Sequence, residues 1–189
     1  MRKIFLSAGH SLGPQGDPGA SANGYIEAVL TVKYRQQLAY ELEELGICPI
    51  LDENRNVLAQ SLRYFKTLTK PDTIVCDIHY NSGPSTATGT ETFIDSKPTV
   101  FEIELAHEMS KAVSETLNIP LRGNYKGYKG VRTELESHHK NLAWFDLKAE
   151  NILLEICFLS NIFDMKSYDA NWKELAKKHA KILYKYANK

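Results

Sequence analysis

The sequence predicts a single-domain, layered α/β fold built on a largely parallel β-sheet. Short apolar, β-branched segments alternate along the chain with longer segments of helical periodicity, an order typical of α/β folds. The segment 152–159 is apolar except for Glu155, as expected of a strand that is covered on both faces. The chain of 189 residues contains no repeat and no linker, so we expect one domain spanning residues 1–189.

The N-terminal half is predicted to contain three strands and two helices. An apolar run over residues 4–8 ends at Gly9 and His10, and the Gly-, Pro- and Ser-rich residues 11–23 are expected to form a long loop. Residues 24–45 predict a helix that stops at Gly46, because apolar residues recur there at helical spacing: Leu30, Tyr34, Leu38, Leu42 and Leu45. The next elements are a strand, a helix and a β-branched strand, at residues 47–51, 57–68 and 73–79.

The C-terminal half continues the alternation. Its predicted elements are a strand, a helix, a strand and a helix, at residues 90–94, 100–117, 152–159 and 171–187, and the Gly- and Tyr-rich residues 122–130 are expected to be a loop. The last helix has an apolar stripe that includes His179, so we expect His179 to be packed in the core. The lysines off this stripe are expected to be solvated, with contact to an anionic polymer as the alternative.

The composition argues against several classes of function. The 23 basic and 23 acidic residues balance, so we expect no nucleic-acid partner. No apolar run reaches the roughly 18 residues of a membrane span, and the first residues resemble a strand rather than a signal peptide. We therefore expect synthesis in the cytoplasm.

Cys48, Cys76 and Cys157 lie far apart in apolar segments, which predicts buried thiols rather than disulfides or a metal site.

Four polar residues stand in or just after apolar segments: His10, Glu27, His79 and Glu155. The two histidines fall at the carboxyl ends of predicted strands, where open α/β sheets bind ligands. Glu27 lies on the apolar stripe of the first helix, whose start returns to the same edge, and a buried carboxylate normally has a cation or metal beside it. Two imidazoles and two carboxylates suit a catalytic zinc site, with three as ligands and one for proton transfer.

Each of these residues also has a structural interpretation. A histidine at a strand end can simply be hydrogen-bonded, Glu27 could stay partly exposed in a first helical turn, and Glu155 could form a buried ion pair with a lysine or arginine. Desolvation would otherwise raise the pKa of Glu155 toward neutrality and suit it to proton transfer. The adjacent His138 and His139 lie in a polar segment that we expect to be exposed, with contact to substrate or a surface metal as the alternative.

Four short segments follow one another in the order of a known family: Ala8-Gly9-His10, residues 23–27, residues 78–81 and residues 154–161. They resemble the signature segments of the zinc-dependent N-acetylmuramoyl-L-alanine amidases of the third amidase type, found in bacterial wall hydrolases, autolysins and phage endolysins. The resemblance covers nearly the whole chain. It implies a twisted mixed, mostly parallel sheet of about six strands flanked by helices.

The resemblance also implies a site and a reaction. His10, Glu27 and His79 would be the ligands of a single zinc ion per chain, and Glu155 would be the catalytic carboxylate. The partner would be peptidoglycan, and the bond hydrolysed would join N-acetylmuramic acid to L-alanine. The same ligands would also serve a zinc peptidase or carboxypeptidase acting within the stem peptide, or the fold could be that of a non-catalytic wall-binding domain. The presence of Glu155 in an apolar strand argues against the last alternative.

Three positions near the expected site depart from the family. The family usually has an aspartate at Ser7, a serine at Asp77 and a glycine at Cys157, and the first two changes could alter the hydrogen bonds that orient the histidines. Arg63 resembles an arginine usual in the second helix, and we expect it to be structural.

We expect a monomer that acts on the cell wall after release, as a phage lysin does or within a phage-like particle. The alternative is a chain from which the signal segment has been removed.

Overall fold

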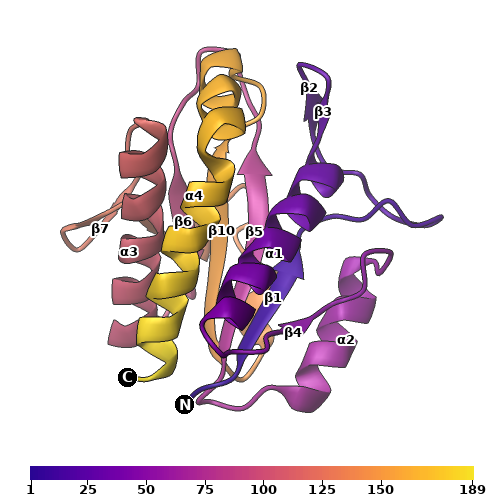
Figure 1. The fold of residues 1–189 in the computed structure, drawn as a ribbon, viewed down its shortest axis with the longest axis vertical. Coiled ribbons are helices and arrows are strands. Elements are labelled where there is room, and N and C mark those ends of the chain that lie inside the picture. The colour runs from indigo at the N-terminus through magenta and orange to yellow at the C-terminus, as the bar shows by residue number, and fades with distance from the viewer.

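A six-stranded β-sheet in the order β4-β1-β5-β10-β6-β9 forms the centre of the computed structural model, which describes residues 1–189 (Figure 1). β1 is parallel to β4 and β5, β5 is parallel to β10, β6 is antiparallel to β10, and β9 is parallel to β6. The sheet is therefore mixed and mostly parallel, which confirms the predicted fold class. In chain order its strands are Ile4–Ala8 (β1), Ile50–Leu51 (β4), Ile74–Asn81 (β5), Glu91–Ile94 (β6), Val131–Thr133 (β9) and Glu150–Phe158 (β10).

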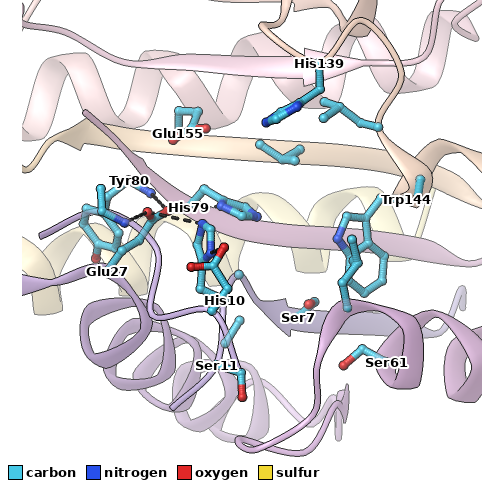
Figure 2. A pocket seen from close by; sticks show the side chains of 18 of the residues that line it. Ser7, His10, Ser11, Glu27, Ser61, His79, Tyr80, His139, Trp144 and Glu155 are labelled. Atoms are coloured by element: carbon cyan, nitrogen blue, oxygen red, sulfur yellow. Dashed lines mark hydrogen bonds and ion pairs between the residues drawn. The ribbon is translucent and has the colours of Figure 1, made fainter. Parts of the chain in front are cut away.

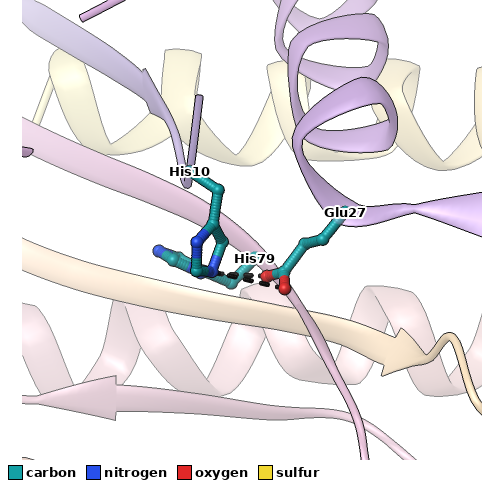
Figure 3. Close-up of side chains that lie close together, drawn as sticks. All are labelled: His10, Glu27 and His79. Atoms are coloured by element: carbon teal, nitrogen blue, oxygen red, sulfur yellow. Dashed lines mark hydrogen bonds and ion pairs between the residues drawn. The ribbon is translucent and has the colours of Figure 1, made fainter. Parts of the chain in front are cut away.

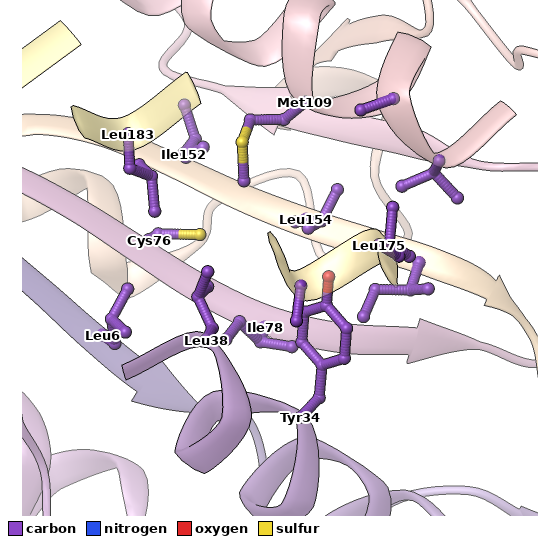
Figure 4. Close-up of a cluster of buried hydrophobic side chains, with 14 of the residues drawn as sticks. Leu6, Tyr34, Leu38, Cys76, Ile78, Met109, Ile152, Leu154, Leu175 and Leu183 are labelled. Atoms are coloured by element: carbon purple, nitrogen blue, oxygen red, sulfur yellow. The ribbon is translucent and has the colours of Figure 1, made fainter. Parts of the chain in front are cut away.

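Two layers of unequal thickness cover the sheet. On one face three long helices pack over a cluster of 34 buried residues, part of which is drawn in Figure 4. On the other face a shorter helix and two 3-10 turns cover a cluster of only 8 buried residues. The thin layer leaves part of this face open. The long helices are Glu27–Glu44 (α1), Val100–Leu117 (α3) and Ile162–Ala187 (α4), and the thin layer contains Leu58–Leu68 (α2), Glu134–Glu136 (η1) and Ala143–Asp146 (η2).

Strand alternation assigns side chains to these two faces. In β5, Cys76, Ile78 and Tyr80 belong to the large cluster, whereas Val75 belongs to the small one. Asp77 and His79 continue the side of Val75 toward the carboxyl end of the strand. The thinly covered face thus changes from apolar to polar where the parallel strands end.

Two helices begin at positions other than those predicted. α1 begins at Glu27 rather than at residue 24, because Tyr25–Ile26 (β3) pairs with Ser21–Ala22 (β2) in a small hairpin. α4 begins at Ile162 rather than at residue 171, because the side chain of Asn161 caps it by accepting hydrogen bonds from the backbone N–H groups of Phe163 and Asp164.

Two predicted segments differ in other ways. The expected loop at 122–130 contains a hairpin of Asn124–Tyr125 (β7) and Tyr128–Lys129 (β8), and the edge strand β9 that follows was not predicted. Cys48 is exposed, so its predicted burial is wrong: the regular strand there is limited to Ile50–Leu51. Cys76 and Cys157 are buried free thiols, as predicted.

The predicted core position of His179 is confirmed. Its side chain is buried and lies between the Tyr34 hydroxyl, 2.8 Å from Nδ1, and the Met109 carbonyl oxygen, 3.0 Å from Nε2. Because a carbonyl only accepts, Nε2 carries the proton and Nδ1 accepts from the tyrosine. No helix combines the length and apolarity that crossing a bilayer requires.

Candidate metal centre and catalytic cleft

Three side chains from distant parts of the sequence converge at the carboxyl edge of the sheet. His10 directly follows β1, Glu27 is the first residue of α1 and His79 is on β5; each offers a ligand atom, and these atoms lie within 4.8 Å of one another. Both imidazole rings face the carboxylate of Glu27 (Figure 3). His10 Nε2 lies 3.3 Å from Glu27 Oε2, and His79 Nδ1 lies 3.1 Å from Glu27 Oε1.

Two glycines, Gly9 and Gly19, leave the space in which the side chains of His10, Glu27 and His79 come together. A Cβ atom at Gly9 would lie 2.3 Å from His79 Cε1, and one at Gly19 would lie 2.6 Å from His10 Cγ and 2.7 Å from Glu27 Oε2. His10 itself has a φ of 66°, a left-handed conformation that turns the chain sharply out of β1. Such a conformation is uncommon for a residue other than glycine, and it is often found at functional sites.

The carboxylate of Glu27 is buried and hydrogen-bonded on both oxygens. Oε1 accepts from the Tyr80 backbone N–H at 3.1 Å, and Oε2 accepts from the Ala20 N–H at 3.0 Å. Burial alone would raise the pKa of Glu27, but the contacts with His10 and His79 outweigh it and hold the pKa well below its usual range. Glu27 is therefore ionised and needs positive charge beside it. Two imidazoles and one buried carboxylate are the donor set of a three-ligand zinc site with an open position, so the residues fit the ion.

Glu155 lies next to the three candidate metal ligands without being one of this group. On β10 it is the neighbour of His79 on β5 and of Glu91 on β6, and it faces the same cleft (Figure 2). Its buried Oε2 has no hydrogen-bond partner, and no lysine or arginine forms an ion pair with it. The ion-pair interpretation of Glu155 is therefore wrong. Burial raises the pKa of Glu155 to about 8, although the nearby His79 opposes the shift.

The outer nitrogens of the two histidines also face carboxylates. His79 Nε2 lies 2.9 Å from Oδ2 of the fully buried Asp77, and His10 Nδ1 lies 3.4 Å from Oδ2 of the exposed Asp17. Of the three departures from the family pattern, Asp77 alone contacts a candidate ligand. Ser7 does not orient His10: its hydroxyl donates to Asp52 at 3.1 Å. Cys157 packs against Met165 in the core.

Asp52, which follows β4 and lines the cleft, is the centre of a buried polar group. It pairs with Arg35, and it accepts hydrogen bonds from the Ser61 hydroxyl at 2.8 Å and the Ala8 N–H at 3.3 Å. Burial nevertheless raises the pKa of Asp52, against the effect of Arg35. The sequence suggested Arg63 for a structural role, but Arg63 is exposed on α2 and its side chain forms no hydrogen bond or ion pair. The buried arginine is Arg35, on α1.

The candidate ligands and Glu155 line one end of a cleft of about 850 Å³ (Figure 2). Its far wall comes from residues 137–144, and the start of α2 forms another side. His138 and His139 are exposed, as predicted, and both line this wall, so contact with substrate stays a prediction for them. Sequence reasoning missed Trp144, which lines the cleft and packs against Phe65 with ring centroids 5.5 Å apart. The apolar sequence 142–145 within a polar stretch was the only signal for it.

Comparisons with known proteins agree with this architecture. The protein family described as N-acetylmuramoyl-L-alanine amidase matches residues 4–185. The uncharacterized protein YqiI of Bacillus subtilis (strain 168) is 24% identical over 164 residues, which are 86% of this chain and 73% of that protein.

Solved structures with this fold include two amidases. The crystal structure of N-acetylmuramoyl-L-alanine amidase from Clostridium difficile 630 has a TM-score of 0.76 at 21% identity, covering 99% of this chain and 97% of that one. The putative N-acetylmuramoyl-L-alanine amidase from Neisseria meningitidis has a TM-score of 0.76 at 24% identity, covering 97% and 94%. At these identities the structures establish a shared fold.

Proposed function

The chain belongs to the N-acetylmuramoyl-L-alanine amidase family, whose members hydrolyse peptidoglycan, and on this premise we propose that it does so with one zinc ion held by His10, Glu27 and His79. The bond cleaved is the amide between N-acetylmuramic acid and L-alanine. The observation that carries the proposal is the convergence of three ligand atoms within 4.8 Å beside Glu155, a carboxyl group that no cation pairs with.

Each residue has a distinct role in this proposal. A bound zinc ion supplies Lewis acidity, which polarises the amide carbonyl and lowers the pKa of water. Glu27 supplies the negative charge of the ligand set, and its backbone hydrogen bonds from Ala20 and Tyr80 fix its orientation before any ion binds. His10 and His79 supply neutral nitrogen donors on either side of it.

Glu155 is the proton-transfer group. Its unpartnered oxygen is free to take a proton from the attacking water and return it to the departing amine. The raised pKa suits both steps, since a carboxyl group that titrates near neutrality can accept and release a proton at physiological pH. Its place on β10, between β5 and β6, keeps this group fixed relative to His79.

The cleft has room for a polymeric substrate. Its volume of about 850 Å³ exceeds what a single amide group requires, and its lining combines polar residues near the ligands with apolar ones around Trp144. Such a groove can hold a sugar on one side of the scissile bond and a short peptide on the other. Peptidoglycan presents both at the muramic acid to alanine link.

Metal content tests the ligand assignment. Purified protein is expected to contain close to one zinc per chain, and His79→Ala is expected to lose most of it. Elemental analysis after dialysis against a weak chelator measures both. A His10→Ala, His79→Ala double variant that kept full zinc occupancy would refute the assignment.

Glu155→Gln separates binding from chemistry. This variant keeps the shape of the side chain and removes the proton acceptor, so it is expected to fold, retain zinc and lose about 10²- to 10⁴-fold in rate. If it released the metal instead, Glu155 would be a ligand and one of the other three residues would need a new role.

Product analysis identifies the bond. Digestion of purified peptidoglycan is expected to release whole stem peptides with a new N-terminal L-alanine, and to leave muramic acid with a free lactyl carboxylate. Mass spectrometry of the soluble fraction reads both products. Fragments cut within the peptide, with the muramic acid to alanine link intact, would favour a zinc peptidase instead.

A further inference from the structure

The imidazole of His79 lies between two carboxylates. Nδ1 is 3.1 Å from Glu27 Oε1 and Nε2 is 2.9 Å from Asp77 Oδ2. His10 lies on the same side of the His79 ring as Nδ1, because its Nε2 is 3.3 Å from Oε2, the other oxygen of Glu27. The ligand atoms therefore converge on Nδ1, and Nε2 points away from them toward Asp77.

Asp77 has no other polar partner. It is fully buried, its Oδ2 contacts His79, and its Oδ1 has no hydrogen bond. A buried carboxylate without a compensating donor is strongly unfavourable, so the imidazole N–H is what the carboxylate requires. The two residues are also fixed relative to each other, because they are two apart on β5 and point to the same face.

We propose that Asp77 is a positioning residue of the metal centre, which holds His79 with its proton on Nε2 and its lone pair on Nδ1 directed at the ion. The proposal rests on the proposed zinc site. A carboxylate only accepts hydrogen bonds, so Nε2 must donate, and in a neutral imidazole the other nitrogen is then the acceptor that can ligate. A carboxylate behind a ligating histidine also raises the basicity of that ligand.

The carboxylate at position 77 determines this arrangement. A serine hydroxyl at the same position could either donate to or accept from the ring, so it would not select one tautomer. Asp77 selects one and adds a negative charge next to the ligand. His10 has no equivalent support, because its outer nitrogen faces Asp17, whose side chain is 79% exposed and 3.4 Å away. Of the two candidate histidine ligands, only His79 therefore has its outer nitrogen against a buried carboxylate.

Zinc affinity provides the first test. In a competition titration with a chromophoric chelator, Asp77→Ser is expected to bind zinc about 10- to 100-fold more weakly than the unaltered protein. Asp77→Asn keeps a hydrogen-bond acceptor without the charge, so its affinity is expected to lie between the two. Both variants remove an incompletely paired buried charge and are expected to fold, which thermal melts of the metal-free proteins check.

A matched control is Glu102→Gln. Glu102 is also a buried carboxylate, but it accepts hydrogen bonds from the backbone N–H groups of Asn151 and Thr99 at the start of α3. Its substitution is expected to leave zinc affinity unchanged. If both Asp77 variants bound zinc as tightly as the unaltered protein, the proposal would be refuted while the zinc site itself stood. Failure of the unaltered protein to bind zinc would instead reject the proposed function.

NMR of ¹⁵N-histidine-labelled, zinc-loaded protein provides a second test that does not depend on affinity. The His79 ring is expected to show a protonated Nε2 whose N–H exchanges slowly, and an Nδ1 shift typical of a metal ligand. In Asp77→Ser the same N–H is expected to exchange faster. A zinc-bound Nε2 in the unaltered protein would overturn the proposal.

Discussion

Gly9→Ala adds one methyl group directly against the candidate metal centre. The new Cβ would lie 2.3 Å from His79 Cε1, 2.4 Å from Nε2 and 2.6 Å from Nδ1. Non-bonded carbon atoms normally approach no closer than about 3.5 Å, so the ring or the backbone must shift by about 1 Å. The backbone conformation of Gly9 is not left-handed, so alanine adds no conformational strain of its own.

Neither partner can move freely. The Gly9 backbone is held by its N–H, which donates to the Ile78 carbonyl at 2.9 Å, and by its carbonyl, which accepts from the Thr31 hydroxyl at 2.7 Å. The ring of His79 is held between Asp77 and Glu27. A displacement of about 1 Å in such a site can reduce catalysis by about 10²-fold. We expect a loss of at least that size in amidase rate, accompanied by weaker zinc binding.

Gly83→Ala is the matched control. It lies in the loop after β5, its nearest neighbour to an added Cβ is Phe158 Cε1 at 3.5 Å, and its φ is not positive. Zinc content and the rate of release of soluble wall fragments are measured for both variants, and only Gly9→Ala is expected to change them. If Gly9→Ala matched Gly83→Ala in both assays, the contact between Gly9 and His79 would not position the metal ligand.

Three further variants test the scaffold. Burial lowers the pKa of His179 from 6.5 to about 4. Between these pH values the unfolded chain therefore binds more protons than the folded chain. The contribution of the neutral ring to the free energy of unfolding is complete above pH 6.5 and falls by about 3 kcal/mol toward pH 4. Urea unfolding across this range should show a smaller loss in His179→Gln, and an equal loss would count against this account. Asn161→Ala removes the α4 cap and should cost about 1 kcal/mol in the same assay. Arg35→Met leaves the buried Asp52 without its cation and should cost about 3–5 kcal/mol, so an unchanged unfolding midpoint would contradict the role of this pair.

The elements that the sequence predicts best are those with a strong local signal. The helix expected at 100–117 is α3, whose start is fixed by a capping box in which Thr99 and Glu102 bond to each other's backbone. Strand β10 is identifiable from its apolar run. The edge strand β9 has only three residues and exists because it pairs with β6, a long-range contact that no local pattern specifies.

The same distinction applies to the site. His10, Glu27, His79 and Glu155 could be selected from the sequence because each is a polar residue where the surroundings predict an apolar one. Residues 137–144 offer no such contrast, since their place in the cleft depends on the packing of Trp144 against Phe65 across the chain. The contact of Asp77 with His79 was anticipated only as an altered hydrogen bond, because which ring nitrogen it meets depends on the rotamer of the histidine.

The register of the central strands explains how one sheet serves both core and site. Side chains on β5 alternate between the thick helical layer and the opposite face, so a slip of one residue would turn His79 toward the core. β10 matches β5 residue for residue up to the pair of Glu155 with His79, and its register then shifts before Phe158 pairs with Asn81. Such irregularities bend a strand and are frequent beside active sites. The continuous pairing of β10 with β5 runs as far as Glu155, so the ladder fixes Glu155 beside His79.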